Sequence, residues 1–335
     1  MDLSIVSWNA YGIMAHLDDF THFLSKGSCS ADIICLQETH LTCNSLFVNG
    51  YSIITKNRVW KKGGGVAILI KNTFRFEEIP VEGDMEAVGC KLFCSLEKGS
   101  YDPKHEQIKG SNFIYIYCVY LPPNNKLNVE SLRKINIYKN TLIVGDINAK
   151  SPTWGSKQLD CRGKVIEEFL DTADLICISN KQGTRIGKYG KMSNLDIAFS
   201  SYNLVAKTKC MVLDDCCGSD HLPLQVTLEI GSIKGTDVNS GLNYNKANWG
   251  EFINFMIEQT QPINVKGNSY NVAEDIKNFT EVIKTGMKQC IPVIKKTNKT
   301  LSKIHLKQPP YWTASCSEAI RKRKAALKKL IKNNN

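Results

Sequence analysis

The chain has 335 residues, of which 42% are hydrophobic and 22% charged, and its formal net charge is +11. This length predicts one large domain with a smaller one, or two ordinary domains, with enough apolar residues for a sizeable core. The longest apolar runs, such as residues 66–70, have the length of a strand and are too short for a membrane span. The N-terminus lacks a basic segment followed by an apolar stretch, so no secretory signal is expected.

The cysteines and the charges narrow the class further. The 13 cysteines are scattered without regular spacing, which favours buried free thiols in a reducing compartment over a disulfide framework or a zinc site. Residues 241–335 carry 17 of the 43 basic and 6 of the 32 acidic side chains. Residues 1–240 therefore hold 26 basic and 26 acidic side chains, and their charges balance. A neutral body with a basic tail indicates contact with an anionic polymer, although a solvated, lysine-rich helical surface has the same composition.

Strand patterns dominate the first 230 residues. Strands are predicted at 3–8, 32–36, 65–70, 87–94, 113–121, 141–144, 175–178, 195–199, 210–213 and 222–230, and helices at 17–24, 129–138 and 165–173. The last strand alternates apolar residues from Leu222 to Ile230, as expected of a half-buried strand. Many strands with few helices predict an α/β fold, a four-layer α/β sandwich of two stacked mixed β-sheets flanked by helices.

The tail is predicted to be a basic helical C-terminal extension. Trp249, Phe252 and Met256 follow the helical period behind Asn248, a plausible N-cap, and residues 317–332 form an amphipathic helix with a strongly basic face. No partner helix long enough to complete a core is evident, so the tail is expected to be incomplete as a folding unit. The predicted organisation is a domain at 1–230, a Gly/Ser/Asn-rich linker at 231–243 and the extension at 244–335.

Polar residues repeatedly lie at the ends of the predicted apolar strands. Each one alone is explained by a turn or by a solvated strand end. Together they supply the carboxylates, amides, hydroxyl and imidazole that a metal-dependent phosphate site requires. The residues are Asn9, Glu38, Tyr120, Asp146, Asn148, Asp196, Asp220 and His221.

The order of six short motifs carries a resemblance. WNxxG at 8–12, QET at 37–39, YxPP at 120–123, GDxN at 145–148, LD at 195–196 and SDH at 219–221 resemble the endonuclease/exonuclease/phosphatase superfamily. Specifically, residues 1 to about 230 resemble the apurinic-type endonuclease domain of non-LTR, jockey-like retrotransposon reverse-transcriptase proteins. The tail segments ANWGEF and PPYWTASCSEAIRKRKAALKKL resemble the link to a reverse transcriptase, which is expected downstream although no polymerase motif follows in this chain.

The resemblance implies a metal site. Glu38 is expected to be the principal ligand of Mg²⁺, or of Mn²⁺ in its place, assisted by Asn9 and Asp220. Repair enzymes of the superfamily carry an acidic residue two positions after the Asn of the first motif, where this chain has Tyr11. That departure puts one metal-binding group in doubt and favours the retroelement branch over the repair branch.

The resemblance also implies the catalytic roles. Asp146 would orient or deprotonate the attacking water, and Asn148 would hold the phosphate or Asp146 itself. His221 would bind a non-bridging phosphate oxygen, with Asp196 raising its affinity for the proton. Tyr120 would steady the phosphate or the leaving oxygen.

The implied function is a Mg²⁺-dependent DNA endonuclease that nicks one strand and leaves a 3′-hydroxyl primer for retrotransposon reverse transcription. The basic, Gly-rich segments 57–65 and 181–194 are the candidates for DNA contact, although solvated hairpin tips explain them equally well. Their predicted DNA-binding residues are Arg58, Lys61, Lys62, Arg185, Lys188, Lys191 and Asn194. The expected partners are DNA and, through the basic tail, element RNA, with no membrane contact. The expected location is intracellular, and nuclear when DNA is cut.

Three alternatives stay open at this point. An abasic-site repair endonuclease would use the same motifs. A phosphatase of the superfamily would carry additional arginine-rich phosphate-binding signatures, which the surroundings of GDIN and LD lack. A decayed element copy would bind nucleic acid through its tail without cleaving it.

Overall fold

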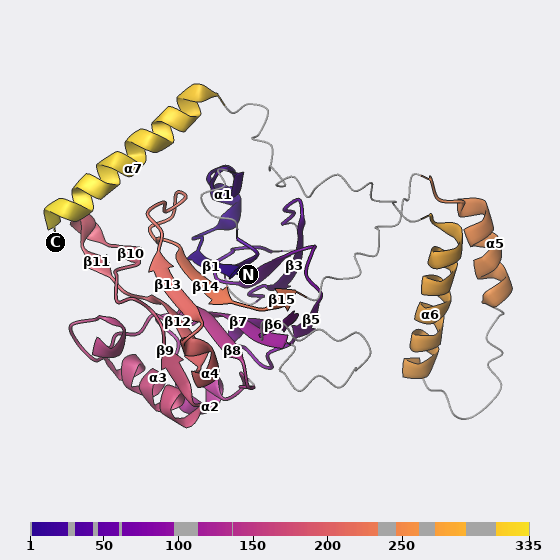
Figure 1. The fold of residues 1–335 in the computed structure, drawn as a ribbon, viewed down its shortest axis with the longest axis horizontal. Helices are drawn as coiled ribbons and strands as arrows, with labels where there is room; N and C mark the ends of the chain where they lie inside the picture. Colours follow the sequence, from indigo (N-terminus) through magenta and orange to yellow (C-terminus); the bar gives the residue numbers. More distant parts are fainter. Residues whose placement is uncertain are drawn as a thin grey trace. The chain divides into compact units, whose positions relative to one another are not determined.

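The computed structural model describes residues 2–25, 31–42, 46–59, 62–96, 113–135, 137–233, 246–260, 272–292 and 313–334. The chain forms two compact units, one of Met1–Gly235 with Ile304–Asn335 and the other of Thr236–Lys303. The first unit contains two β-sheets flanked by helices (Figure 1), so the predicted α/β sandwich is confirmed. The boundaries 1–230, 231–243 and 244–335 stay a prediction. The structure adds that the end of the chain groups with the first unit.

The first sheet has six strands in the order β13-β14-β1-β2-β4-β3. The strands β1 and β2 are parallel, whereas every other neighbouring pair in the sheet is antiparallel. This sheet is therefore mixed. Its strands are β1 (Asp2–Asn9), β2 (Ile33–Gln37), β3 (Tyr51–Lys56), β4 (Val66–Lys71), β13 (Thr208–Val212) and β14 (Leu224–Glu229).

The second sheet has the order β15-β6-β7-β8-β12-β9, with β5 paired to β6. The strands β7 and β8 are parallel, so this sheet is mixed as well. Its strands are β5 (Phe76–Ile79), β6 (Glu86–Ser95), β7 (Phe113–Tyr120), β8 (Thr141–Asp146), β9 (Leu175–Cys177), β12 (Asp196–Ser201) and β15 (Ser232–Ile233). A separate small hairpin pairs β10 (Arg185–Ile186) with β11 (Met192–Ser193).

Three apolar clusters account for the layers. Alternate residues of the central strands, such as Ile5, Ile68 and Ile116, are fully buried between the sheets. The intervening residues pack outward, against helix α1 on the first sheet and against α2 and α3 on the second. The central strands are therefore buried on both faces, which explains their nearly continuous apolar sequences. Helices of the first unit are α1 (Leu17–Ser25), α2 (Val129–Leu132), α3 (Cys161–Thr172), α4 (Tyr202–Val205) and the 3₁₀ turns η1 (Ile13–Ala15), η2 (Pro152–Trp154) and η3 (Lys188–Gly190).

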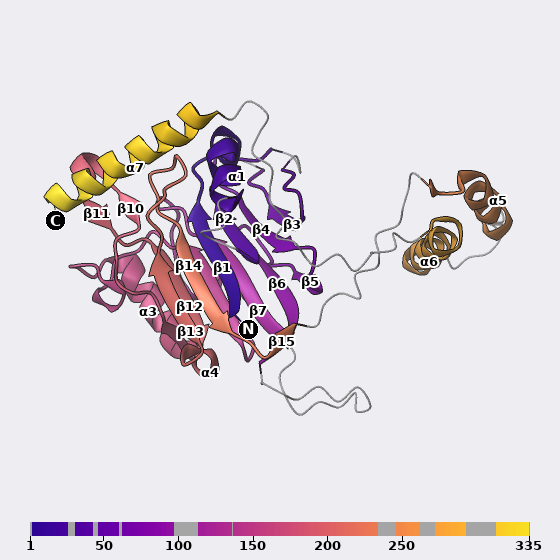
Figure 2. The ribbon, with the colours of Figure 1, turned by 45° about the horizontal axis from the view of Figure 1, so that its top comes forward.

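The tail forms helices, as predicted. Helices α5 (Trp249–Gln259) and α6 (Val272–Cys290) pair with each other in the second unit, and α7 (Ala314–Asn334) belongs to the first unit. The side chain of Asn248 accepts a hydrogen bond from the amide of Glu251, which confirms it as the N-cap of α5. Among the described residues, no helix is both long and apolar enough to span a bilayer. The second view (Figure 2) also shows α7 passing α1 towards β10 and β11.

The observed elements differ from those predicted from the sequence in two ways. The prediction missed β3, β5, β10, β11 and β15, which are half-buried edge strands or two-residue pairs with a weak apolar pattern. The helix expected at 129–138 ends at Leu132. The described cysteines are free, and most of them are buried.

Candidate active site

The ends of both sheets bring the predicted polar residues to one place. Because β1 and β2 are parallel and in register, Asn9 lies beside Gln37, and Glu38 follows directly. In the second sheet Asp146 ends β8 opposite Asp196, which begins β12. Residues from four strands therefore meet at one edge of the sandwich.

Asn9 connects the two sheets across this edge. Its Nδ2 donates to Glu38 Oε1 at 3.0 Å and to Asp146 Oδ2 at 2.9 Å. Its Oδ1 accepts from the amide of Tyr11 at 3.1 Å, which fixes the orientation of the side-chain amide. Glu38 and Asn148 adopt positive φ angles of 47° and 43°, an uncommon conformation that is typical of constrained functional positions. The predicted metal ligand and the predicted base thus share one amide group.

Asp196 and His221 form a buried pair on the other side of Asp146. His221 Nδ1 donates to Asp196 Oδ2 at 2.7 Å. Burial alone would lower the pKa of His221, but the charge and hydrogen bond of Asp196 outweigh it and raise that pKa to about 9. The imidazole is therefore cationic near neutral pH, and its Nε2 remains available to donate to a phosphate oxygen.

Asp146 lies in an excess of negative charge. Burial, and then the neighbouring Asp196, raise the pKa of Asp146 to about 7, against the opposing effects of His221 and of hydrogen bonds from Asn9 and Asn148. The backbone amide of Asn148 donates to Asp146 Oδ1 at 3.0 Å. A carboxyl group with such a pKa can exchange a proton with water near neutral pH.

The donor set fits a hard divalent cation. Ligand atoms of Asp146, Asp196 and His221 lie within 4.8 Å of one another, and Asp196 Oδ1 is buried without a hydrogen-bond partner among the described residues. Glu38 reaches the same Asp146 through Asn9. Mg²⁺ and Mn²⁺ prefer oxygen ligands of this kind, and a cation would offset the clustered carboxylates. Carboxylate oxygens that could hold such a cation come from Glu38, Asp146 and Asp196.

Asp220 is placed differently from the other predicted ligands. Its Oδ2 accepts from Arg185 Nε at 3.0 Å, while its Oδ1 lies 3.9 Å from His221 Nε2. The side chain is 39% exposed, whereas those of Asp196 and His221 are almost fully buried. Asp220 therefore lies at the rim of the site and holds Arg185 there.

His221 belongs to residues 213–223, which we call the SDH loop. Side chains of Ser219 and Trp8 hold the backbone of this loop in place. Ser219 Oγ donates to the carbonyl of Asn9 at 2.8 Å and accepts from the amide of His221 at 3.1 Å. Trp8 Nε1 donates to the carbonyl of His221 at 3.3 Å. Ser219 and Trp8 belong to the motifs, but no sequence pattern indicates that they anchor the loop to β1.

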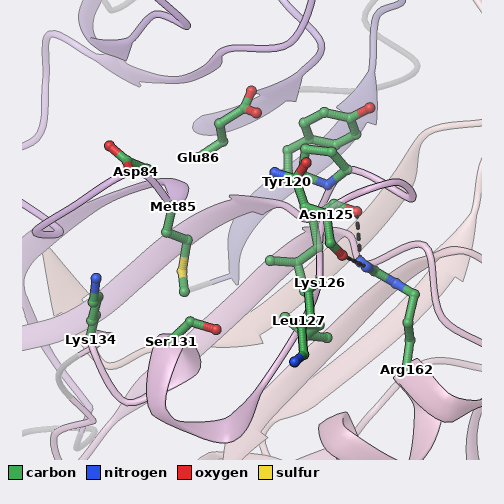
Figure 3. A pocket seen from close by; sticks show the side chains of 12 residues that line it. Asp84, Met85, Glu86, Tyr120, Asn125, Lys126, Leu127, Ser131, Lys134 and Arg162 are labelled. Carbon is green, nitrogen blue, oxygen red and sulfur yellow. Dashed lines mark hydrogen bonds between the residues drawn. The ribbon is translucent and has the colours of Figure 1, made fainter.

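Tyr120 ends β7 opposite Asp146. Burial raises the pKa of Tyr120 far above its usual value, and the charge and hydrogen bonding of Glu38 add to this effect. The hydroxyl group therefore stays protonated and acts as a donor. Tyr120 also lines a cavity of about 190 Å³. Figure 3 shows Tyr120 and Arg162 on one side of this cavity and Lys134 on the other.

Arg162 is a residue that sequence reasoning missed. Its guanidinium donates to the carbonyls of Asn148 at 2.8 Å, Asn125 at 2.7 Å, Leu121 at 3.0 Å and Ile147 at 3.3 Å. The side chain thereby ties together the loops that follow β7 and β8. Its position in α3, after the Asp160 N-cap, gave no signal of this role.

The segment 57–65 connects β3 and β4, as a hairpin requires. Arg58 donates through Nε and Nη2 to Glu86 Oε1 at 2.9 and 2.5 Å and lies 5.9 Å from the centre of the Tyr120 ring. Lys62 is exposed, and Lys61 lies outside the described residues. Arg58 is thus held at the rim of the site.

The segment 181–194 is attached to the SDH loop. The amide of Ile186 donates to the carbonyl of Asp220, and that of Leu222 to the carbonyl of Thr184, both at 2.7 Å. At its tip, Tyr189 is 86% exposed with a φ of 60°. The side chains of Arg185, Lys188 and Lys191 are exposed as well.

Asn194 does not lie on this exposed surface, contrary to expectation. It is 5% exposed, and its Nδ2 donates to the carbonyl of Trp154. Asn194 follows β11 into the sheet, so its side chain turns inward towards η2. A direct contact of this side chain with DNA is therefore not supported.

Comparisons with known proteins agree with this geometry. Residues 114–225 match the family described as endonuclease-reverse transcriptase. The chain is 24% identical over 296 residues to the probable RNA-directed DNA polymerase from transposon X-element of Drosophila melanogaster, covering 86% of this chain and 30% of that protein. It is 21% identical over 251 residues to the RNA-directed DNA polymerase from mobile element jockey of the same organism, covering 69% and 24%. The chain thus spans less than a third of these relatives.

Solved structures share the fold. The endonuclease domain of TRAS1, a telomere-specific non-LTR retrotransposon, superposes with a TM-score of 0.55 at 16% identity, over 69% of this chain and all of that one. AP endonuclease LMAP from Leishmania major superposes with a TM-score of 0.54 at 16% identity, over 68% of this chain and 88% of that one. The Xenopus laevis APE2 catalytic domain superposes with a TM-score of 0.53 at 18% identity, over 69% of this chain and 93% of that one. The resemblance expected from the six motifs is confirmed.

Proposed function

We propose that this chain is a Mg²⁺-dependent DNA endonuclease that nicks one strand and leaves a 3′-hydroxyl for reverse transcription. One observation carries the proposal. The side-chain amide of Asn9 joins Glu38 to Asp146, and Asp146 in turn adjoins the Asp196–His221 pair. A carboxylate that can activate a nucleophile, a candidate cation site and a positively charged imidazole thereby lie next to one another, as hydrolysis of a phosphodiester requires.

In the proposed reaction, Asp146 accepts a proton from water as its oxygen attacks phosphorus. His221 donates from Nε2 to a non-bridging oxygen and stabilises the negative charge that develops there. The bond from phosphorus to O3′ breaks, and the leaving oxygen takes up a proton to become the 3′-hydroxyl, opposite a 5′-phosphate. Tyr120 donates to the phosphate from the side of Glu38. Glu38 would hold a divalent cation, which would supply additional charge stabilisation at the phosphate.

The rim of the site supports a duplex substrate. Arg58, Arg185 and Lys188 lie on the two segments that flank the site, and cations in such places contact phosphates with little regard to sequence. Tyr189 is exposed between Lys188 and Lys191, a placement that suits insertion between bases or stacking on one. We infer that binding depends on salt and on groove shape.

The proposed partners follow from the relatives. Both curated relatives are named as RNA-directed DNA polymerases, so a polymerase on a longer protein is the proposed user of the nick. Exposed cations of α7, such as Arg321 and Lys322, are candidates for contact with element RNA. An endonuclease of this kind would act in the nucleus.

Nicking of supercoiled plasmid, with and without Mg²⁺, tests the proposal. The wild-type chain should convert plasmid to open circles in a Mg²⁺-dependent reaction, and end mapping should find 3′-hydroxyl groups. The variants Glu38→Ala and His221→Ala should each lose roughly a thousandfold in rate. Equal nicking by wild type and both variants would mean contamination or a wrong assignment, and an inert wild type would support a chain that only binds nucleic acid.

Abasic-site repair remains the second candidate, because one of the similar structures is an AP endonuclease. Cleavage of an abasic oligonucleotide, measured beside the intact one, separates the two functions. We expect comparable rates, since Tyr11 replaces an acidic residue and is 61% exposed. A preference for the abasic substrate by orders of magnitude would reverse the choice.

A further inference from the structure

Helix α7 is joined by ion pairs to the loop that carries His221. Lys324 Nζ lies 2.7 Å from Asp215 Oδ2, and Arg323 Nη2 lies 3.6 Å from Asp215 Oδ1. Arg323 Nη1 also donates to Asp19 Oδ2 in α1 at 2.8 Å. The Asp215 side chain is 7% exposed, so removal of its cations would leave a nearly buried charge without neutralisation.

Asp215 begins a series of contacts that leads into the site. Its Oδ1 accepts from the amide of Cys217 at 3.2 Å. Two residues later, the hydroxyl of Ser219 binds the carbonyl of Asn9 and the amide of His221. The ion pairs of α7 therefore act on the same turn that sets the position of the imidazole.

The turn itself is constrained and packs against α1 and η1. Cys217 and Gly218 have φ angles of 48° and 95°. A Cβ atom on Gly218 would lie 2.5 Å from His16 Nδ1 and 3.1 Å from Asp19 Oδ2. A non-glycine residue at positive φ persists where its surroundings hold it. Here Asp19, which Arg323 binds, is one of those surroundings.

Cations on the other face of α7 do not take part in this contact. The side chains of Arg321 and Lys322 are 79% and 74% exposed, and they pair with Glu318 one turn earlier in the same helix. Those of Arg323 and Lys324 are 37% and 29% exposed. The helix thus carries two adjacent pairs of cations in different environments.

We propose that α7 positions the SDH loop for cleavage, with Arg323 and Lys324 as positioning residues acting through Asp215 and Asp19. This inference rests on the proposed nuclease function. It assigns the end of the chain a role in the geometry of the site, in addition to any general attraction for nucleic acid. Loss of the two cations should loosen the turn 215–219 and displace Ser219 and His221.

The test compares three double variants of the full chain. Arg323→Ala with Lys324→Ala removes the docking cations. Arg321→Ala with Lys322→Ala removes the same charge from the exposed face, and Arg323→Lys with Lys324→Arg keeps the docking charges. Amide hydrogen exchange is measured at Cys217, Ser219 and His221, and kcat and KM are measured by plasmid nicking.

We expect the first variant to exchange these amides about tenfold faster and to lose about tenfold in kcat with little change in KM, because small displacements of a reacting group are costly. The exposed-face variant should raise KM and leave exchange unchanged, and the conservative variant should match wild type. Unchanged exchange in the first variant, or an equal rise in the exposed-face variant, would overturn the inference. An inert wild type would overturn the nuclease proposal, while the exchange data would still decide whether α7 holds the loop.

Discussion

The two compact units differ in how completely they bury their apolar side chains. In the first unit, buried clusters fill the space between the sheets and both outer faces. In the second, no residue of α5 is buried, and Trp249, Ile253 and Ile257 are 47%, 55% and 66% exposed. Among the described residues of this unit, Cys290 and Ile291 are 7% and 1% exposed, and a Cβ added at Gly286 would lie 2.8 Å from Phe255.

This difference shows what a buried polar site requires. The desolvation of Asp146, Asp196 and His221 is tolerated because rigid strands on either side hold their partners in place. A helix pair with exposed apolar faces cannot impose such geometry. That the tail is incomplete as a folding unit stays a prediction.

Replacing a tryptophan in each unit should give the largest effect. Trp154 is fully buried, and its Nε1 donates to the carbonyl of Ala149 at 3.0 Å, whereas Trp249 is half exposed. Trp154→Ala should lower the free energy of unfolding of the first unit by about 3–5 kcal/mol. Trp249→Ala should cost about 1 kcal/mol or less. Urea unfolding followed by circular dichroism measures both, and similar losses would mean that the second unit is as well packed as the first.

An asparagine in each unit provides the second test. Asn9→Ala removes the donor shared by Glu38 and Asp146, and we expect kcat/KM for nicking to fall by about a hundredfold. Asn248→Ala removes the cap of α5 at a cost of about 1 kcal/mol to that helix and should leave nicking unchanged. An active Asn9→Ala variant would show that the two carboxylates do not need the shared amide.

The pH dependence should give a smaller effect. Activity should rise as pH increases through about 7, because Asp146 must lose its proton, and fall above about 9, because His221 must keep its own. Saturating Mg²⁺ should move the acidic limb below 7, since a cation favours the ionised carboxylate. Asp196→Asn should move the alkaline limb to lower pH by about one unit or more, because Asp196 raises the pKa of His221. An alkaline limb unchanged in Asp196→Asn would exclude His221 as its origin.

Much of the fold could be predicted from the sequence because the central strands are buried on both faces. The segments 3–8, 65–70 and 113–121, for example, agree with β1, β4 and β7 to within one residue at each end. Edge strands such as β3 were not predicted, because one side of the strand faces solvent and its apolar and polar residues do not alternate clearly. The helix predicted from residue 129 ran too long because Ile135 and Ile137 continue its apolar stripe although they pack there without helical structure.

The sequence motifs identify the residues that would react or bind the phosphate. They do not identify the residues that hold those side chains in position. Strand ends revealed Asp146, Asp196 and His221, and the structure brings them together. Arg162 binds backbone carbonyls, and such partners leave no trace in sequence spacing. Asn194 carries the same side chain whether it faces DNA or the interior, so only the path of β11 could decide its direction.

The attachment of segment 181–194 sets limits on any attempt to retarget this protein. Thr184 and Ile186 are hydrogen-bonded to the backbone on either side of His221, so exchanging them for foreign sequence would disturb the chemistry. The tip beyond them, residues 187–191, has three exposed side chains, those of Lys188, Tyr189 and Lys191. Because α7 packs against η3 within that tip, a graft there should alter the docking of α7 as well as the surface that we propose meets DNA.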